Sequence, residues 1–191
     1  MTPNIILASN SPRRKGLLTQ IGLSFTVAPA DVDESVLPGE SPEAYAVRVA
    51  LDKARIAAER AGEGIVIAAD TIVVVGDIIL GKPSGPADAR RMLSMLSGRG
   101  HEVITGLAVV DAATGRFTVR TSATQVWFRE LSDREIASYV ATDEPLDKAG
   151  AYGIQERGAL LVERIEGCYS NVVGLPLSLL GEMLREFGVS L

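Results

Sequence analysis

The polar and apolar positions of the first half of the chain predict short buried strands that alternate with amphipathic helices. An apolar run over 5–8 precedes Ser11 and Pro12, and a serine N-cap with proline at the first helical position is a helix-start signal. Ser41-Pro42-Glu43 repeats this signal. The segment after it carries apolar residues at helical spacing, namely Val47, Ala50, Leu51, Ala54 and Ala58.

The middle of the chain contains the longest apolar run, over 65–75, which is β-branched and interrupted by Asp70. This run predicts a central strand. Gly76-Asp77 is a two-residue hairpin signal before a returning strand at 78–80. Further on, Ser132 and Glu135 have the spacing of a capping box at the start of a helix.

The expected elements combine alternation in the first half with hairpins in the second. Strands are expected at 5–9, 25–29, 65–75, 78–80, 101–110, 117–128 and 160–165, and helices at 12–22, 42–62, 86–98, from 132 onward, and at 176–187. Alternation favours parallel pairing, whereas hairpins require antiparallel pairs. The order therefore predicts an α/β fold with a mixed sheet flanked by helices, in a single domain over residues 1–191.

Composition narrows the function classes. The formal net charge of -5 disfavours a long nucleic-acid duplex as a partner, because its phosphates require a basic face. The chain has one cysteine, Cys168, and one histidine, His101, which excludes an intramolecular disulfide and a histidine-based metal cluster. Cys168 is expected to be a small core residue and His101 structural or exposed. No secretory signal or membrane-spanning run is visible, so a cytoplasmic setting is expected.

A basic run opens the first predicted helix. Arg13, Arg14 and Lys15 follow the turn Ser9-Asn10-Ser11, at the helix end where the dipole is positive and cations cost stability. An incoming anion would compensate, because free backbone N–H groups and guanidinium groups both bind phosphate. A solvated basic first turn is the alternative interpretation.

Asp70 is the second anomaly, since an unpaired carboxylate inside a buried strand costs several kcal/mol. A cation, a metal or exposure must compensate for it. The alternative is a strand kink at which Asp70 caps a neighbouring element. A polar pair such as Asp70-Thr71 in so apolar a strand favours a functional site.

Three further segments carry candidate chemistry. The acidic turn Asp31-Val32-Asp33-Glu34 could hold Mg²⁺, and a solvated loop explains it equally well. Gly81-Lys82-Pro83 supplies one cation after the hairpin, without the spacing of a P-loop. The loop Asp147–Gln155 has glycines that permit close approach of a ligand, or it is a plain connection. From these residue types alone, phosphoryl chemistry or nucleotide binding can be inferred, but not the type of reaction.

The chain nevertheless resembles the Maf family of nucleotide pyrophosphatases almost from end to end. The segments that carry the resemblance are ASNSPRRKGLL, AADTIVVV, ILGKP, TGLAV, DKAGAYGIQ and EGCYSNVVGLPL. The resemblance implies an elongated mixed α/β sheet of inosine triphosphatase-like architecture, with two lobes around a central cleft. It also implies hydrolysis of a nucleoside triphosphate to the monophosphate and pyrophosphate with Mg²⁺ or Mn²⁺, and a homodimer. The acidic composition and the lack of a membrane-spanning run predict no nucleic-acid or membrane partner.

The same resemblance assigns roles to residues of this sequence. Asp70 resembles, by its position, the residue that serves the family as general base and as a metal ligand. Glu34 resembles the second acidic residue, which also binds the metal. The substrate-binding residues that it implies are Ser9, Arg13, Arg14, Lys53 and Lys82, and the base-selecting residues are Arg13, Thr71 and Gln155. The GAYGIQ form resembles the branch that acts on dTTP and UTP. The alternatives are a 7-methyl-GTP pyrophosphatase and a non-catalytic nucleotide-binding regulator of cell division.

Overall fold

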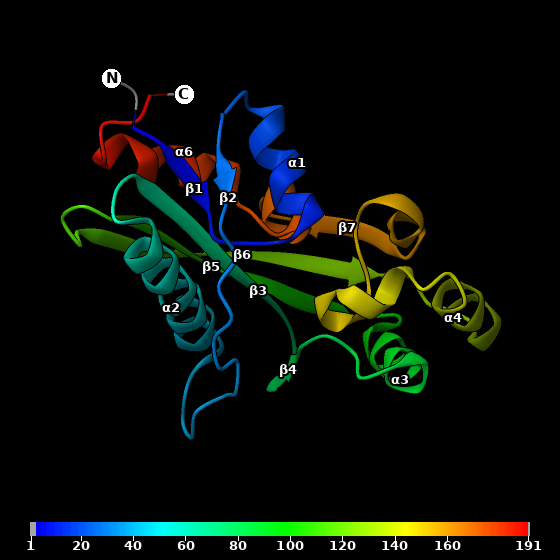
Figure 1. Ribbon diagram of the computed structural model, residues 1–191. Helices are drawn as coiled ribbons and strands as arrows, with labels where there is room; N and C mark the ends of the chain where they lie inside the picture. Colours follow the sequence, from blue (N-terminus) through cyan, green and yellow to red (C-terminus); the bar gives the residue numbers. More distant parts are fainter. Residues whose placement is uncertain (1–2, 191) are drawn as a thin grey trace. The chain divides into compact units, whose positions relative to one another are not determined.

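The computed structural model describes residues 3–190 and consists of a mixed α/β sheet with helices (Figure 1). In chain order the elements are β1 (Ile5–Leu7), α1 (Pro12–Gln20), β2 (Thr26–Val27), α2 (Pro42–Ala61), β3 (Ile65–Val75), β4 (Ile78–Leu80), α3 (Pro86–Leu96), β5 (Gly100–Asp111), β6 (Phe117–Phe128), α4 (Asp133–Val140), η1 (Glu144–Asp147), η2 (Ala149–Ala151), η3 (Glu156–Leu160), β7 (Val162–Glu166), α5 (Tyr169–Val173) and α6 (Leu177–Glu186), where η denotes a 3-10 helix.

The sheet contains both kinds of pairing that the sequence predicts. Its strand order is β2-β1-β3-β5-β6-β7, with β4 paired to β3. β1 is parallel to β2 and to β3, as the alternation of strands and helices predicts. β3 and β4 form the antiparallel hairpin expected around Gly76-Asp77, and β6 pairs with β7 in antiparallel register. The mixed α/β fold is therefore confirmed.

The chain divides into two compact units. Unit 1 comprises residues 3–70, 105–122 and 174–190, and unit 2 comprises 71–104 and 123–173. Three long strands therefore contribute their two halves to different units. β3 changes unit between Asp70 and Thr71, so the polar pair that interrupts its apolar run marks the division.

Unit 1 is built around α2, which Figure 1 shows on the opposite side of the strands from α6. Small side chains let this helix approach the sheet closely: Ala50, Ala54 and Ala57 pack against Val66 and Ala108. The approach is closest at Gly106 of β5, where an added Cβ would lie 2.2 Å from the backbone of Ala46. A glycine is thus required at the crossing of β5 and α2.

Unit 2 has its own aromatic core. His101, Phe128 and Tyr152 meet edge to face, with ring centroids 4.7–5.4 Å apart. The Nε2 atom of His101 lies 2.8 Å from the Tyr152 hydroxyl, and burial lowers the pKa of His101 to about 4. His101 is therefore a neutral structural residue, one of the two roles expected for it.

Some local expectations need correction. Cys168 is only half-buried and lies 3.2 Å from the Ser170 hydroxyl, so it is not a core residue. The expected loop Asp147–Gln155 contains the 3-10 turn η2 and is preceded by η1, and the short helix α5 was not expected. The helix starts are confirmed: the hydroxyls of Ser11, Ser41 and Ser132 all cap their helices, the last in a complete capping box. None of the helices in the described part of the chain has the length and apolar character needed to cross a bilayer.

Candidate active site

The start of α1 presents cations where a helix ordinarily prefers acids. Ser11 caps the helix by accepting from the Arg14 backbone N–H at 3.4 Å, and the first turn has no acidic residue. Arg13, Arg14 and Lys15 are each partly exposed. This end of α1 therefore combines the positive end of the helix dipole with cationic side chains, as an anion-binding site requires.

The Arg14 guanidinium is fixed from two sides within unit 1. Its Nε donates to the Gly174 carbonyl at 2.8 Å, and its Nη1 donates to Ser9 Oγ at 3.2 Å. Desolvation is the main effect on Arg14 and lowers its pKa, and the negative charges of Asp70 and Glu34 partly offset that effect. Arg14 is thus a pre-oriented cation whose electrostatic environment includes both candidate carboxylates.

The buried carboxylate of Asp70 is neutralised by Lys53. Asp70 is 8% exposed in β3, and its Oδ1 lies 2.8 Å from Lys53 Nζ. The same ammonium lies 2.6 Å from Glu34 Oε1. Lys53 therefore bridges two carboxylates that come from separate segments and would otherwise repel each other.

Two residues of α2 hold the Glu34 segment in place. Tyr45 Oη donates to the Glu34 carbonyl at 2.8 Å, and Arg48 Nη2 donates to the Ser35 carbonyl at 2.8 Å. A bidentate ion pair with Glu40 fixes the Arg48 guanidinium: Nε donates to Oε1 at 2.6 Å and Nη2 donates to Oε2 at 2.9 Å. Burial, followed by the charges of Asp70 and Glu34, raises the pKa of Tyr45 to about 12, so its phenol stays protonated and donates.

Of the acidic turn 31–34, Glu34 is the residue that contacts Lys53. Asp33 instead accepts the Ser35 backbone N–H at 2.9 Å, and this bond is the main reason that the pKa of Asp33 is lowered. Asp33 therefore shapes its own turn, and Asp31 is exposed. The turn contributes a single carboxylate to the contact with Lys53 and Asp70.

The residues fit a hard divalent cation held partly by a substrate. In the described part of the chain, no three His, Cys, Asp or Glu side chains are grouped so that they could hold a metal ion. Asp70 and Glu34 already share one cation, the Lys53 ammonium. Mg²⁺ commonly uses one or two carboxylates and completes its shell with water and substrate phosphates, which matches this pair.

The remaining predicted residues belong to unit 2. Thr71 is partly exposed in β3, whereas Lys82 and Gln155 are exposed. Within this unit, the Gly150 N–H donates to the Gly81 carbonyl at 3.0 Å, so the segment around Lys82 and the loop that leads to Gln155 are joined. Gly150 has φ +67, and an added Cβ would meet Val73 at 2.8 Å, so both conformation and space require glycine there.

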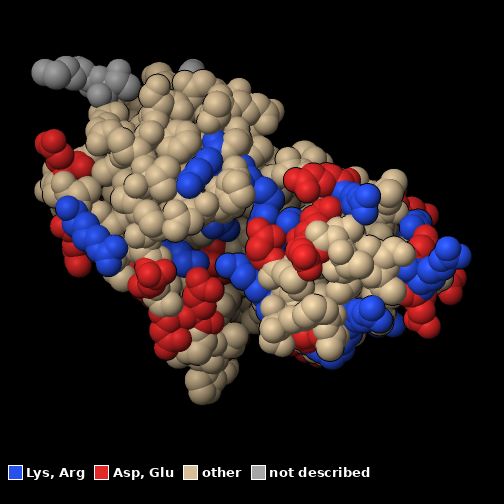
Figure 2. All heavy atoms as spheres, turned by 45° about the vertical axis from the view of Figure 1, so that its right-hand side comes forward, with Lys and Arg blue, Asp and Glu red and all other residues tan. Residues whose placement is uncertain are grey.

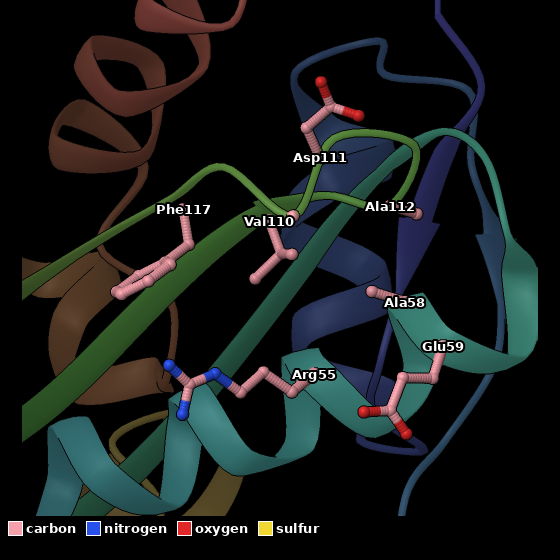
Figure 3. Close-up of a pocket in the computed structure, with 8 residues that line it drawn as sticks. Arg55, Ala58, Glu59, Val110, Asp111, Ala112 and Phe117 are labelled. Atoms are coloured by element: carbon pink, nitrogen blue, oxygen red, sulfur yellow. The ribbon is translucent and has the colours of Figure 1, made fainter.

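A separate hollow in unit 1 contains none of these residues. It lies between α2 and the β5–β6 hairpin and is lined partly by Arg55, Glu59, Asp111 and Phe117 (Figure 3). The Arg55 guanidinium carbon is 5.0 Å from the centroid of the Phe117 ring. This cation–π contact gives Arg55 a structural role away from the candidate site.

Comparison with known proteins identifies the family of the chain. A family model described as "Maf-like protein" matches residues 4–187. The chain belongs to the Maf family. The resemblance found in its motifs is thereby confirmed over nearly the whole sequence.

Similar Maf proteins carry a specific name. The chain is 54% identical over 185 residues to a "dTTP/UTP pyrophosphatase" of Moorella thermoacetica, covering 97% of this chain and 95% of the relative. It is 52% identical over 193 residues to a protein of the same name from Anaeromyxobacter dehalogenans, covering 100% and 97%.

A solved structure agrees with the fold of this Maf protein. A HAM1 protein from Coxiella burnetii superposes with a TM-score of 0.56 at 18% identity, covering 96% of this chain and 99% of that one. At this identity the likeness concerns the fold alone.

The Maf motifs did not point to several residues that organise the site. Tyr45 and Arg48 lie outside the motif segments, whereas Gly174 lies inside one but contributes only a backbone carbonyl. A helical repeat could have indicated Tyr45, because it is eight residues before Lys53 and thus on the same side of α2. No sequence signal distinguishes a carbonyl that binds arginine.

The ion pair predicts a strong coupling in stability. Lys53→Met should lower the free energy of unfolding by about 2–4 kcal/mol, because it leaves Asp70 buried without its counter-charge. Adding Asp70→Asn should recover about half or more of this loss. Urea unfolding of the wild type, both single variants and the double variant measures the coupling.

An exposed ion pair supplies the control for this double-mutant cycle. Arg91 and Asp88 form an ion pair in which the Arg91 side chain is 54% exposed. Arg91→Met should change stability by less than about 0.5 kcal/mol. Strict additivity of Lys53→Met and Asp70→Asn would contradict the coupling.

Proposed function

We propose that this Maf protein is a nucleoside triphosphate pyrophosphatase that hydrolyses dTTP and UTP to the monophosphate and pyrophosphate. The observation that carries the proposal is the Lys53 ammonium between Asp70 and Glu34, in one compact unit with the basic start of α1. The name shared by relatives that are 51–54% identical supports the substrate class.

The cations of α1 supply the phosphate-binding part. Ser9 Oγ accepts from both the Ser11 N–H and Arg14, each at 3.2 Å, so its own O–H can donate to a phosphate oxygen. Arg14 is already oriented, and Arg13 adds a further guanidinium in the same turn. Lys82, which belongs to unit 2, is a further proposed substrate-binding residue. Such fixed donors stabilise charge that develops on the leaving phosphate group.

Asp70 is the proposed general base, and Asp70 and Glu34 are the proposed ligands of Mg²⁺ or Mn²⁺. When bound, the metal would neutralise phosphate charge and polarise the phosphoryl oxygens. Asp70 accepts the proton of a water molecule whose oxygen bonds to one phosphorus of the α–β anhydride. The bond from that phosphorus to the bridging oxygen breaks, and the bridging oxygen leaves on the other product.

The competing hypotheses explain these contacts less well. A sensor that only binds a nucleotide has no need of these two carboxylates, because they take up positive charge that would otherwise attract the phosphates. A nucleic-acid partner is disfavoured because basic and acidic side chains are interspersed on the face in Figure 2. A cytoplasmic location and a homodimer, both expected from the sequence, complete the proposal.

The reaction type has a direct test. With UTP or dTTP and Mg²⁺, we expect the monophosphate and pyrophosphate in equal amounts, and reversible loss of turnover with EDTA. Separation of products by ion-exchange chromatography decides between the hypotheses. Orthophosphate with a diphosphate would contradict the assigned reaction, and nucleotide binding without any turnover would favour the sensor.

The role of Asp70 is tested by Asp70→Asn. The amide keeps the shape of the side chain but cannot accept the proton, so kcat should fall by about two to four orders of magnitude. Circular dichroism and urea unfolding establish that the variant is folded. Full turnover at saturating metal would remove Asp70 from the mechanism.

Base selection is assigned to Gln155 together with Arg13 and Thr71. A uracil or thymine edge presents two carbonyl acceptors that flank an N–H donor, and an amide can pair with one of each. Gln155→Ala should lower kcat/KM for UTP by about tenfold while ATP and GTP change little, since one buried pairing is worth about 1–3 kcal/mol. Steady-state kinetics over a nucleotide panel measures this. An equal loss for every nucleotide would show that Gln155 does not read the base, and a preference for 7-methyl-GTP would favour the other branch.

A further inference from the structure

The segment that carries Gln155 contains backbone in sparsely populated conformations. Among the described residues, the non-glycine residues with positive φ are Asp143, Ala151 and Glu156, at 60°, 59° and 54°, and all three lie between α4 and β7. Such conformations cost about 1–3 kcal/mol each and persist only where surrounding contacts impose them. Gln155 immediately precedes one of them, and its side chain is exposed.

One carboxylate supplies much of that constraint. Glu144 Oε1 accepts the Gly158 N–H at 3.1 Å, and Glu144 Oε2 accepts the Arg157 N–H at 3.2 Å. These two amides come two and three residues after Gln155. The Glu144 carboxylate therefore fixes the backbone on the C-terminal side of Gln155.

Tyr139 fixes the other side of the same turn. Its hydroxyl donates to Glu144 Oε1 at 2.9 Å and accepts the Gly153 N–H at 3.3 Å. Tyr139 is 5% exposed, and burial raises its pKa, so the phenol remains a donor to the carboxylate. The two ends of 153–158 are thus joined through Tyr139 and Glu144.

Close packing reinforces this connection. An added Cβ at Gly158 would lie 1.9 Å from the Gly153 carbonyl oxygen and 2.7 Å from the Tyr139 hydroxyl. The Lys148 ammonium donates to the Glu144 carbonyl, while its aliphatic chain covers Gly153. A turn closed at its base in this way fixes the backbone on both sides of Gln155.

We propose that Tyr139 and Glu144 are positioning residues for substrate selection: they hold the 153–158 turn so that the Gln155 amide is pre-oriented toward the base. This inference rests on the base-reading role proposed for Gln155. A pre-oriented amide discriminates better than a mobile one, because no ordering cost offsets its hydrogen bonds. Neither positioning residue needs to touch the nucleotide.

Tyr139→Phe and Glu144→Gln test the proposal with little change of volume. The first removes the hydroxyl that joins Gly153 to Glu144, and the second replaces one acceptor with a donor facing backbone N–H groups. Hydrogen exchange followed by mass spectrometry reports on the free protein. Amide exchange within 153–158 should be about tenfold faster in both variants, whereas exchange in β3 should be unchanged.

Steady-state kinetics tests whether the 153–158 turn affects the selection of the nucleotide. The ratio of kcat/KM for the preferred nucleotide to that for ATP should fall by about tenfold in both variants, and kcat for ATP should stay within about twofold. Tyr169→Phe and Glu163→Gln, exposed positions of the same unit, are the matched controls and should match the wild type in both measurements.

The outcomes separate this inference from the function on which it rests. Faster exchange with unchanged selectivity would overturn it, as would unchanged exchange. If Gln155→Ala and the two variants reduce all nucleotides equally, Tyr139 and Glu144 only support the loop. A wild type that releases no pyrophosphate from any nucleotide contradicts the proposed function itself, which is seen before any variant is made.

Discussion

The ion pair of Lys53 with Asp70 and Glu34 is the interaction on which the candidate site depends. A carboxylate that is 8% exposed in the middle of an apolar strand is stable there only with a counter-charge, and Lys53 provides it at 2.8 Å. The same ammonium brings in Glu34, whose side chain is half exposed. The two carboxylates are thus held around one ammonium without repelling each other.

Helix α2 makes this arrangement possible because it serves two functions. Its alanine face packs against the sheet closely enough to require glycine at position 106. Tyr45 and Lys53, two turns apart on one side of the helix, contact the Glu34 segment and Asp70. Tight packing of the alanine face therefore determines where Tyr45 and Lys53 lie. A shift of α2 would displace the Glu34 backbone and the Lys53 ammonium together.

Local signals explain which parts of the fold could be predicted from the sequence. Serine caps, the Gly76-Asp77 turn and the apolar run of β3 act within a few residues, and they predicted the helix starts and the main strands correctly. The segment between α4 and β7 could not be predicted, because its 3-10 turns depend on the hydrogen bonds of Glu144 and Tyr139 to distant backbone groups. For the site, Asp70 was an anomaly by itself, whereas Lys53 looked like any cation on a solvated helix face. The family resemblance, and not the residue pattern, assigned Lys53 to the site.

In the proposed mechanism, the Lys53 ammonium competes with a divalent cation for the carboxylates of Asp70 and Glu34. The most direct measurement is the Kd for Mn²⁺ without nucleotide, by isothermal titration calorimetry, in the wild type and in Lys53→Met. Loss of the competing ammonium should tighten Mn²⁺ binding by about tenfold, because two carboxylates lose their internal counter-charge. Unchanged or weaker binding in a folded Lys53→Met protein would contradict the account.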